Sequence, residues 1–111
     1  MPQQAASVLH LPGSYLEKIR SILGQHAPQA EVWAYGSRVA GTGQEASDLD
    51  LVVRNPGDLN AECPGLFALR NAFVESNLPI RVDVMDWARI PAGFREEIER
   101  DYVVVQGGNQ P

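Results

Sequence analysis

Three aspartates and one Gly-Ser pair carry the chemistry that this sequence suggests. Gly36-Ser37 ends an apolar run, and after ten further residues Asp48-Leu49-Asp50 opens a second apolar run. Alternate side chains of a strand share one face, so Asp48 and Asp50 should point the same way while Leu49 points into a core. Two carboxylates so close repel each other unless a cation lies between them, and hard divalent ions such as Mg²⁺ prefer oxygen ligands. The spacing therefore predicts a metal and phosphate site.

The Gly-Ser pair has the properties of a phosphate-binding turn. Glycine lets the backbone approach a ligand closely, and a short helix expected to begin near Arg38 would direct its N-terminal amides at an anion. The hydroxyl of Ser37 adds one more donor. The segment is not a Walker loop, because the Gly-Lys-Ser/Thr ending is absent. Taken alone, the pair describes an ordinary capped turn more often than a ligand site, so its meaning comes from the aspartates that follow.

A third acidic side chain, Asp83, lies in the alternating segment Ile80–Met85. Standing alone between two valines, it would equally suit the solvated face of a half-buried strand. Beside Asp48 and Asp50 on a neighbouring strand, Asp83 completes a cluster of three carboxylates. Such a cluster can hold two Mg²⁺ ions, one on an attacking oxygen and one on a triphosphate leaving group. Asp86 is the alternative third ligand, ranked lower because it lies at the end of the strand.

The elements that must position these residues alternate between helix and strand. The expected strands are 32–35, 49–54, 80–85 and 102–105, and the expected helices run from 14 to 25, from 66 to about 77 and onward from 90–91. Ser14, with Glu17 three residues later, is the predicted N-cap of the first helix. This order predicts an α/β fold. We expect the two acidic strands to be neighbours in one sheet, covered by the helices around Ile19 and Phe73.

Length and composition bound the class of protein. With 111 residues and a hydrophobic fraction of 44%, the chain is expected to form one domain, with residues 1–11 and 107–111 frayed. A net charge of −5 argues against nucleic acid as a direct ligand, since binding its backbone needs clustered Lys and Arg. The single cysteine, Cys63, excludes an internal disulfide and suits a reducing cytosol. No signal peptide or membrane-length apolar run is recognised, so we expect a cytoplasmic protein without membrane contact.

The remaining candidate groups are interpreted as structural. His10 and His26 have no partner at metal-ligand spacing. Cys63 has no basic activator near it in the sequence. Trp33 and Trp87 are expected in the core or at its rim.

The run from Gly36 to Asp50 resembles the minimal nucleotidyltransferase (MNT) domain of the polymerase-β superfamily, whose signature is Gly-Ser, ten residues and Asp-x-Asp. The likeness covers almost the whole chain, including the later strand that bears Asp83 and a final helix and strand. The resemblance implies a mixed sheet flanked by helices, and a reaction that transfers a nucleoside monophosphate from a triphosphate.

The resemblance also implies roles by position. The implied phosphate-binding residues are Gly36, Ser37 and Arg38, and the implied ligands of two Mg²⁺ ions are Asp48, Asp50 and Asp83. Asp83 would be the third ligand or the base for the attacking hydroxyl. The chain departs from the family at Ala40, where members often carry a basic residue before the glycine that corresponds to Gly41. This departure is expected to weaken triphosphate binding.

Many MNT proteins of this size resemble the antitoxin of pairs with a HEPN-domain ribonuclease, and those known as enzymes attach AMP to a tyrosine of the toxin. A chain of 111 residues leaves little room for an acceptor domain of its own. The resemblance therefore implies a hetero-oligomer in which AMP passes from ATP to a hydroxyl of a HEPN partner. Two alternatives stay open: an antitoxin that neutralises its toxin by binding alone, and a nucleotidyltransferase that acts on a small molecule.

Overall fold

The computed structural model describes residues 3–4, 9, 11–36, 39 and 48–107. Within these residues, five strands form one sheet in the order β1-β5-β2-β3-β4. The strands are β1 (Gln3–Gln4), β2 (Glu31–Tyr35), β3 (Leu49–Arg54), β4 (Val82–Asp86) and β5 (Tyr102–Gly107). The described helices are α1 (Gly13–His26), α3 (Leu66–Glu75) and α4 (Ala92–Arg100), with a 3₁₀ turn, η2 (Trp87–Arg89), before α4. The predicted α/β class with a mixed sheet is confirmed.

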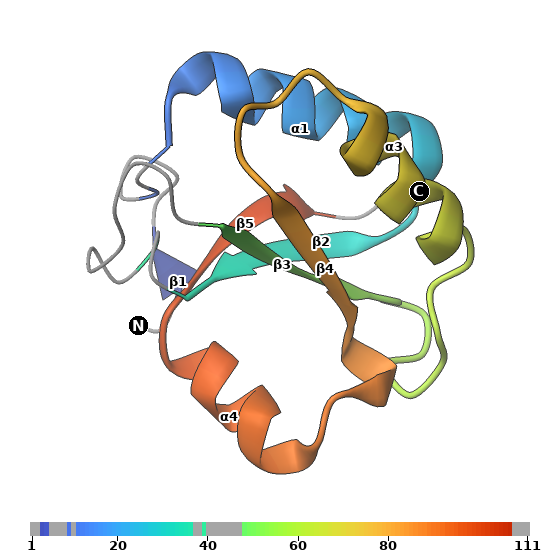
Figure 1. Cartoon of the computed structure of the whole chain (residues 1–111). Helices are drawn as coiled ribbons and strands as arrows, with labels where there is room; N and C mark the ends of the chain where they lie inside the picture. Colours follow the sequence, from blue (N-terminus) through green and yellow to red (C-terminus); the bar gives the residue numbers. More distant parts are fainter. Residues whose placement is uncertain (1–2, 5–8, 10, 37–38, 40–47, 108–111) are drawn as a thin grey trace.

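Helices cover both faces of the sheet, with α1 and α3 on one face and α4 on the other (Figure 1). Ile19 and Leu23 of α1 are four residues apart, as are Leu69 and Phe73 of α3, so each pair forms one buried stripe. These stripes pack on the first face to form the larger core. The smaller core under α4 contains Trp33, Val52, Trp87, Ile90 and Ile98. The helices around Ile19 and Phe73 therefore cover the sheet as expected.

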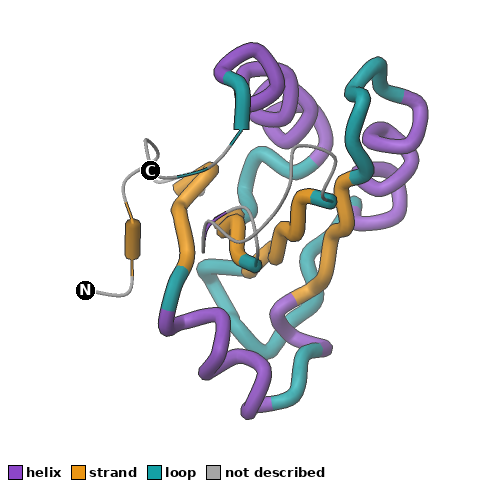
Figure 2. The backbone as a smooth tube through the Cα atoms, turned by 60° about the vertical axis from the view of Figure 1, so that its left-hand side comes forward, coloured by secondary structure: helices purple, strands orange, loops and turns teal. Residues whose placement is uncertain are grey.

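The strands pair in both directions. β2 is antiparallel to β3 and to β5, whereas β3 and β4 run parallel. A parallel pair needs a crossover connection, and the segment that carries α3 supplies it (Figure 2). β4 is an edge strand, and the guanidinium of Arg70 on α3 donates two hydrogen bonds, of 3.0 and 2.7 Å, to the carbonyl of Val84. Arg70 thereby occupies an acceptor that a further strand would otherwise use.

Two local predictions differ from the structure. Helix α1 begins at Gly13 and has no side-chain cap, because the carbonyl of Pro12 already accepts the first helical hydrogen bonds; the predicted Ser14 cap is wrong. The third predicted strand begins two residues later, at Val82, because the ladder with β3 starts where the N–H of Leu49 donates to the carbonyl of Arg81.

Parts of the two ends expected to fray contribute to the sheet. Gln3 and Gln4 pair in parallel with Tyr102 and Val103, and Gly107 belongs to β5. A two-residue strand has too little pattern to be recognised in a sequence, which is why it was not expected. None of the described helices is both long and apolar enough to cross a membrane.

Candidate active site

Strands β3 and β4 bring the predicted carboxylates together. In the parallel register Asp50 lies opposite Asp83, and in the antiparallel register with β2 it lies opposite Tyr35. Asp48 directly precedes β3 and is exposed, while Leu49 between the two aspartates is buried at 1% exposure. Strand alternation thus puts the three aspartates on the side of the sheet that faces α4. The prediction that the acidic strands are neighbours is confirmed.

The carboxylates influence one another electrostatically. Partial burial and then the charges of Asp83 and Asp48 raise the pKa of Asp50 above its ordinary value. Asp83 itself is paired with Arg81, whose Nε donates to Asp83 Oδ1 at 3.0 Å. The pair is open to water, with 74% of the Arg81 side chain and 39% of the Asp83 side chain exposed. Asp48 and Asp50 have no ion pair in the part of the chain that the structure describes.

Gly36 is required at this site for two physical reasons. Its φ of +84° lies in the left-handed region that side chains disfavour. A Cβ at this position would also stand only 2.6 Å from Asp50 Oδ2, so the glycine makes room for that carboxylate. The structure therefore joins the predicted turn to the predicted acidic strand.

The other predicted phosphate-binding residues, Ser37 and Arg38, lie outside the described residues, as does Ala40. Their roles stay predictions. Val39, within the same stretch, is described and is buried at 5% exposure.

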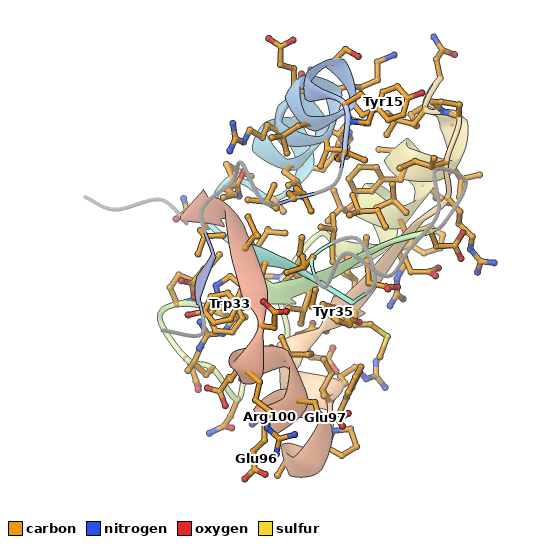
Figure 3. The ribbon with its side chains drawn as sticks, turned by 90° about the vertical axis from the view of Figure 1, so that its left-hand side faces the viewer. Tyr15, Trp33, Tyr35, Glu96, Glu97 and Arg100 are labelled. Carbon is orange, nitrogen blue, oxygen red and sulfur yellow. The ribbon has the colours of Figure 1, made fainter. Side chains whose placement is uncertain are left out.

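Tyr35 is a site residue that the sequence analysis missed. Its ring makes an edge contact with Phe94 of α4, with the centroids 5.7 Å apart, and it lies on the α4 side of the sheet (Figure 3). Burial, followed by the charges of Asp50 and Asp83, raises the pKa of Tyr35 to about 12. The hydroxyl is therefore protonated at neutral pH and can donate a hydrogen bond. Strand alternation could have identified this residue, because Tyr35 directly precedes Gly36 and lies on the same face of β2 as Trp33.

A hollow of about 460 Å³ opens beside these groups. Its lining combines polar groups of the site with apolar side chains of β4 and α3: Tyr35, Asp50, Arg81, Asp83, Phe73, Val74 and Met85 among others. Another cavity, of about 300 Å³, lies at the far end of the strands beside His26 and Cys63 and has no carboxylate in its lining. Of these two hollows, the one at Asp50 and Asp83 has the charged lining that suits a charged substrate.

Asp86, the alternative third ligand, has a structural role instead. It is 3% exposed, and its carboxylate accepts hydrogen bonds from the backbone N–H of Cys63 (2.9 Å) and of Ala88 (3.1 Å). It lies three positions after Asp83, so it faces the opposite side of the strand. Burial, and then the charge of Asp86, raises the pKa of the Cys63 thiol to about 11. Cys63 is therefore a protonated, buried thiol, as expected for a structural cysteine.

A cation stands on the same face of β3 at its other end. The guanidinium of Arg54 lies over the rings of Trp33 and Trp87, 4.0 and 4.7 Å from their centroids, and pairs with Glu31 directly across the ladder. Tyr102 stacks on the outer side of this group, 3.9 Å from Trp33 between centroids. Only 11% of the Arg54 side chain is exposed. Trp33 and Trp87 are themselves 5% and 4% exposed, which confirms both tryptophans as core residues.

The acidic end has the donor chemistry of a Mg²⁺ site. Oxygen ligands from carboxylates suit this ion, and a divalent charge would stabilise the ionised form of Asp50, which burial and then the charges of Asp83 and Asp48 disfavour. The room left by Gly36 beside Asp50 Oδ2 favours the same interpretation. Among the described residues, however, no three His, Cys, Asp or Glu side chains converge into a ready-made metal group.

Comparison with known proteins agrees with this geometry. The model of the nucleotidyltransferase domain family matches residues 16–106. The chain is 43% identical over 100 residues to the probable protein adenylyltransferase MntA of Haemophilus influenzae, covering 88% of this chain and 84% of that protein. It also shares its fold, at a TM-score of 0.66 and 20% identity, with a crystal structure of a toxin–antitoxin with AMP-PNP, covering 86% of this chain and 75% of that one. The chain therefore belongs to the nucleotidyltransferase domain family, as the Gly-Ser and Asp-x-Asp spacing indicated.

Proposed function

We propose that this chain transfers AMP from ATP to a hydroxyl of a partner HEPN-domain toxin, and that it acts as the antitoxin of that partner in the cytoplasm. The observation that carries the proposal is the pairing of Asp50 with Asp83 across β3 and β4, with Asp48 beside them. The relative named as a probable protein adenylyltransferase supports a protein acceptor. The toxin–antitoxin structure of the same fold suggests the kind of partner.

Each carboxylate has a proposed task. Asp48, Asp50 and Asp83 would hold two Mg²⁺ ions, which supply charge neutralisation for the triphosphate and for the attacking oxygen. Asp83 accepts the proton of the acceptor hydroxyl, because a tyrosine hydroxyl with an ordinary pKa of about 10 attacks poorly at neutral pH without a base. The hydroxyl oxygen bonds to the α-phosphorus, and pyrophosphate leaves on the opposite side. Arg81 must release Asp83 first, which its exposure permits.

The phosphates have a proposed place at the turn after β2. The left-handed backbone at Gly36 brings its peptide close to Asp50 without an intervening side chain. We propose that Gly36, together with Ser37 and Arg38, binds the triphosphate there. The phenol of Tyr35, which is protonated at neutral pH, supplies a further donor on the same face.

Mass spectrometry of a co-expressed pair tests the proposal. The HEPN-domain protein encoded beside this chain should carry added AMP when it is co-expressed with the wild-type chain. The addition should be lost with Asp48→Ala or Ser37→Ala. Asp58→Asn is the matched control, because Asp58 is an exposed aspartate in the loop after β3, where its carboxylate accepts the N–H of Asn60. This control should modify the partner as the wild type does.

The alternatives give different outcomes in the same experiment. If the partner stays unmodified and is still inhibited by the Asp48→Ala chain, the chain acts as an antitoxin by binding alone. If no HEPN-domain partner exists, and labelled ATP is instead transferred to small hydroxyl compounds, the chain is a small-molecule nucleotidyltransferase. In either case the proposed protein acceptor is wrong.

A further inference from the structure

The outer face of α3 exposes two large apolar side chains. Phe67 is 78% exposed and Val74 is 82% exposed, more than any other large hydrophobic side chain among the described residues. They are seven positions apart, so they lie two turns apart on one face of the helix. Leu69 and Phe73 hold the opposite face against the sheet. The stripe formed by Phe67 and Val74, here called the α3 stripe, therefore contributes nothing to the core of this chain.

The α3 stripe adjoins the proposed catalytic carboxylates. Val74 lines the same hollow as Asp50 and Asp83, and the part-exposed side chain of Met85 on β4 lines it as well. Single exposed apolar residues are ordinary, but an apolar strip that leads into a reactive site has the character of an interaction surface. Val74 thus links the α3 stripe to the hollow at the β4 edge.

The β4 edge is accessible to side chains rather than to another strand. Arg70, on the flank of α3 that faces β4, donates both of its hydrogen bonds to the carbonyl of Val84. A partner that added a strand here would have to displace that guanidinium. A partner that packs apolar side chains on the α3 stripe would leave it in place. The surface therefore suits docking by a folded face, such as a helix, and not by strand addition.

We propose that the α3 stripe is the docking surface for the protein acceptor, whose own apolar side chains pack on Phe67 and Val74 and so hold its hydroxyl over the hollow beside Asp83. The inference rests on the proposed function, because it assigns the surface that selects the acceptor of that reaction. Interfaces draw most of their affinity from a few well-packed apolar or aromatic anchors. Phe67 is such an anchor at the outer end of the stripe, and Val74 is the anchor nearest the site.

Alanine substitutions test the surface without adding charge. The variants are Phe67→Ala and the double variant Phe67→Ala/Val74→Ala, both in an exposed helix face where alanine is a good helix former. Leu59→Ala is the matched control. Leu59 is also exposed, at 38%, but it lies in the loop after β3, whereas the catalytic carboxylates lie at the start of that strand. Two readouts are needed: transfer of AMP to the co-expressed HEPN-domain protein, and complex formation with it on a sizing column. Calorimetric titration of the isolated Phe67→Ala chain with Mg-ATP gives the reference for its nucleotide site.

The double variant should lower the rate of partner modification about 10- to 100-fold and weaken the complex by a similar factor. Mg-ATP affinity of Phe67→Ala should match the wild type, and Leu59→Ala should behave as the wild type throughout. Wild-type modification and binding by the double variant would overturn the docking surface and leave the proposed function standing. If the wild-type chain binds the partner without modifying it, the proposed transfer is wrong, and the sizing column alone then decides whether the α3 stripe holds the partner.

Discussion

The two ends of β3 present opposite charges on the same face of the sheet. At its start, Asp48 and Asp50 stand beside Asp83, partly open to water and short of positive charge. At its end, Arg54 is enclosed by two tryptophans and paired with Glu31. A charge that already has its partners within the fold stabilises the fold. A charge without them raises the free energy of the folded chain until a ligand arrives, which is the mark of a binding site.

Removing a carboxylate at the acidic end should have the largest effect, and only on activity. Asp50→Asn should lower nucleotidyl transfer roughly 1000-fold, because metal-assisted charge stabilisation of the transition state is worth several kcal/mol. The free energy of unfolding in metal-free buffer should be unchanged or slightly higher, since one repelling charge is gone. Transfer assays and urea unfolding measure the two quantities. Retained transfer with the same Mg²⁺ dependence would show that these carboxylates do not bind the metal.

Removing the cation at the other end should act on stability. Arg54→Met keeps much of the side-chain volume but leaves Glu31 unpaired, and should lower the free energy of unfolding by about 2–4 kcal/mol. The expected loss lies below the range for fully buried pairs because 26% of the Glu31 side chain is exposed and the Nε–H of Arg54 has no partner among the described residues. Urea unfolding measures the loss, and the folded fraction should retain transfer. An unchanged midpoint would mean that the cluster contributes no net stability.

Comparing substitutions of two glycines should distinguish the effect of backbone strain on stability from an effect on activity. Gly36→Ala and Gly65→Ala each force a side chain into a left-handed backbone, at a cost of about 1–2 kcal/mol. The new Cβ at Gly36 would meet Asp50, whereas that at Gly65 would meet the carbonyl of His26, at 2.8 Å. Both variants should be destabilised in urea, but only Gly36→Ala should also lose transfer per folded molecule. Equal transfer by both would place the phosphate-binding turn elsewhere.

The free energy of unfolding should depend on pH through the protonation of Asp50. The pKa of Asp50 is raised from 3.8, so the folded chain binds this proton more tightly than the unfolded chain does. The free energy of unfolding in metal-free buffer should therefore fall as the pH rises through the raised pKa. Asp50→Asn should remove that part of the decline, and saturating Mg²⁺ should reverse it in the wild type. A metal-free stability that rises over this range, with no difference in Asp50→Asn, would contradict the raised pKa of Asp50.

The smallest effect is expected for the ion pair at the acidic end. Arg81→Gln breaks an exposed pair and should change the free energy of unfolding by less than about 1 kcal/mol, far less than Arg54→Met. It should also tighten Mg²⁺ binding, because Asp83 then has no competing guanidinium. Calorimetric titration with Mg²⁺ checks the second point. A loss of stability as large as that of Arg54→Met would remove the distinction between the two ends.

The sequence predicted the acidic end better than the cationic end. Asp48, Asp50 and Asp83 follow from strand alternation and from the spacing after Gly36, which local chemistry determines. Arg54 shares the period of Asp50, so its face was predictable. Its burial was not, because the two tryptophans that enclose it come from β2 and from η2, and only the tertiary fold brings them together.

The misses in local structure have the same origin. The sequence offered Ser14 as a cap, but Pro12 precedes it and starts the helix earlier. Strand β1 has two residues and is a strand only because it pairs with β5, and a local sequence pattern cannot predict that pairing.

The parallel pairing of β3 with β4 has a consequence for how the protein acquires activity. Asp50 and Asp83 become neighbours only after the chain between them has crossed over the sheet with α3 in place. Closing so long a connection carries a substantial entropic cost, and parallel contacts of this kind form late and slowly. A chain emerging from the ribosome, or one partly unfolded by heat, therefore holds each carboxylate without its counterpart. Chemistry at this site is in effect reserved for molecules that have completed folding.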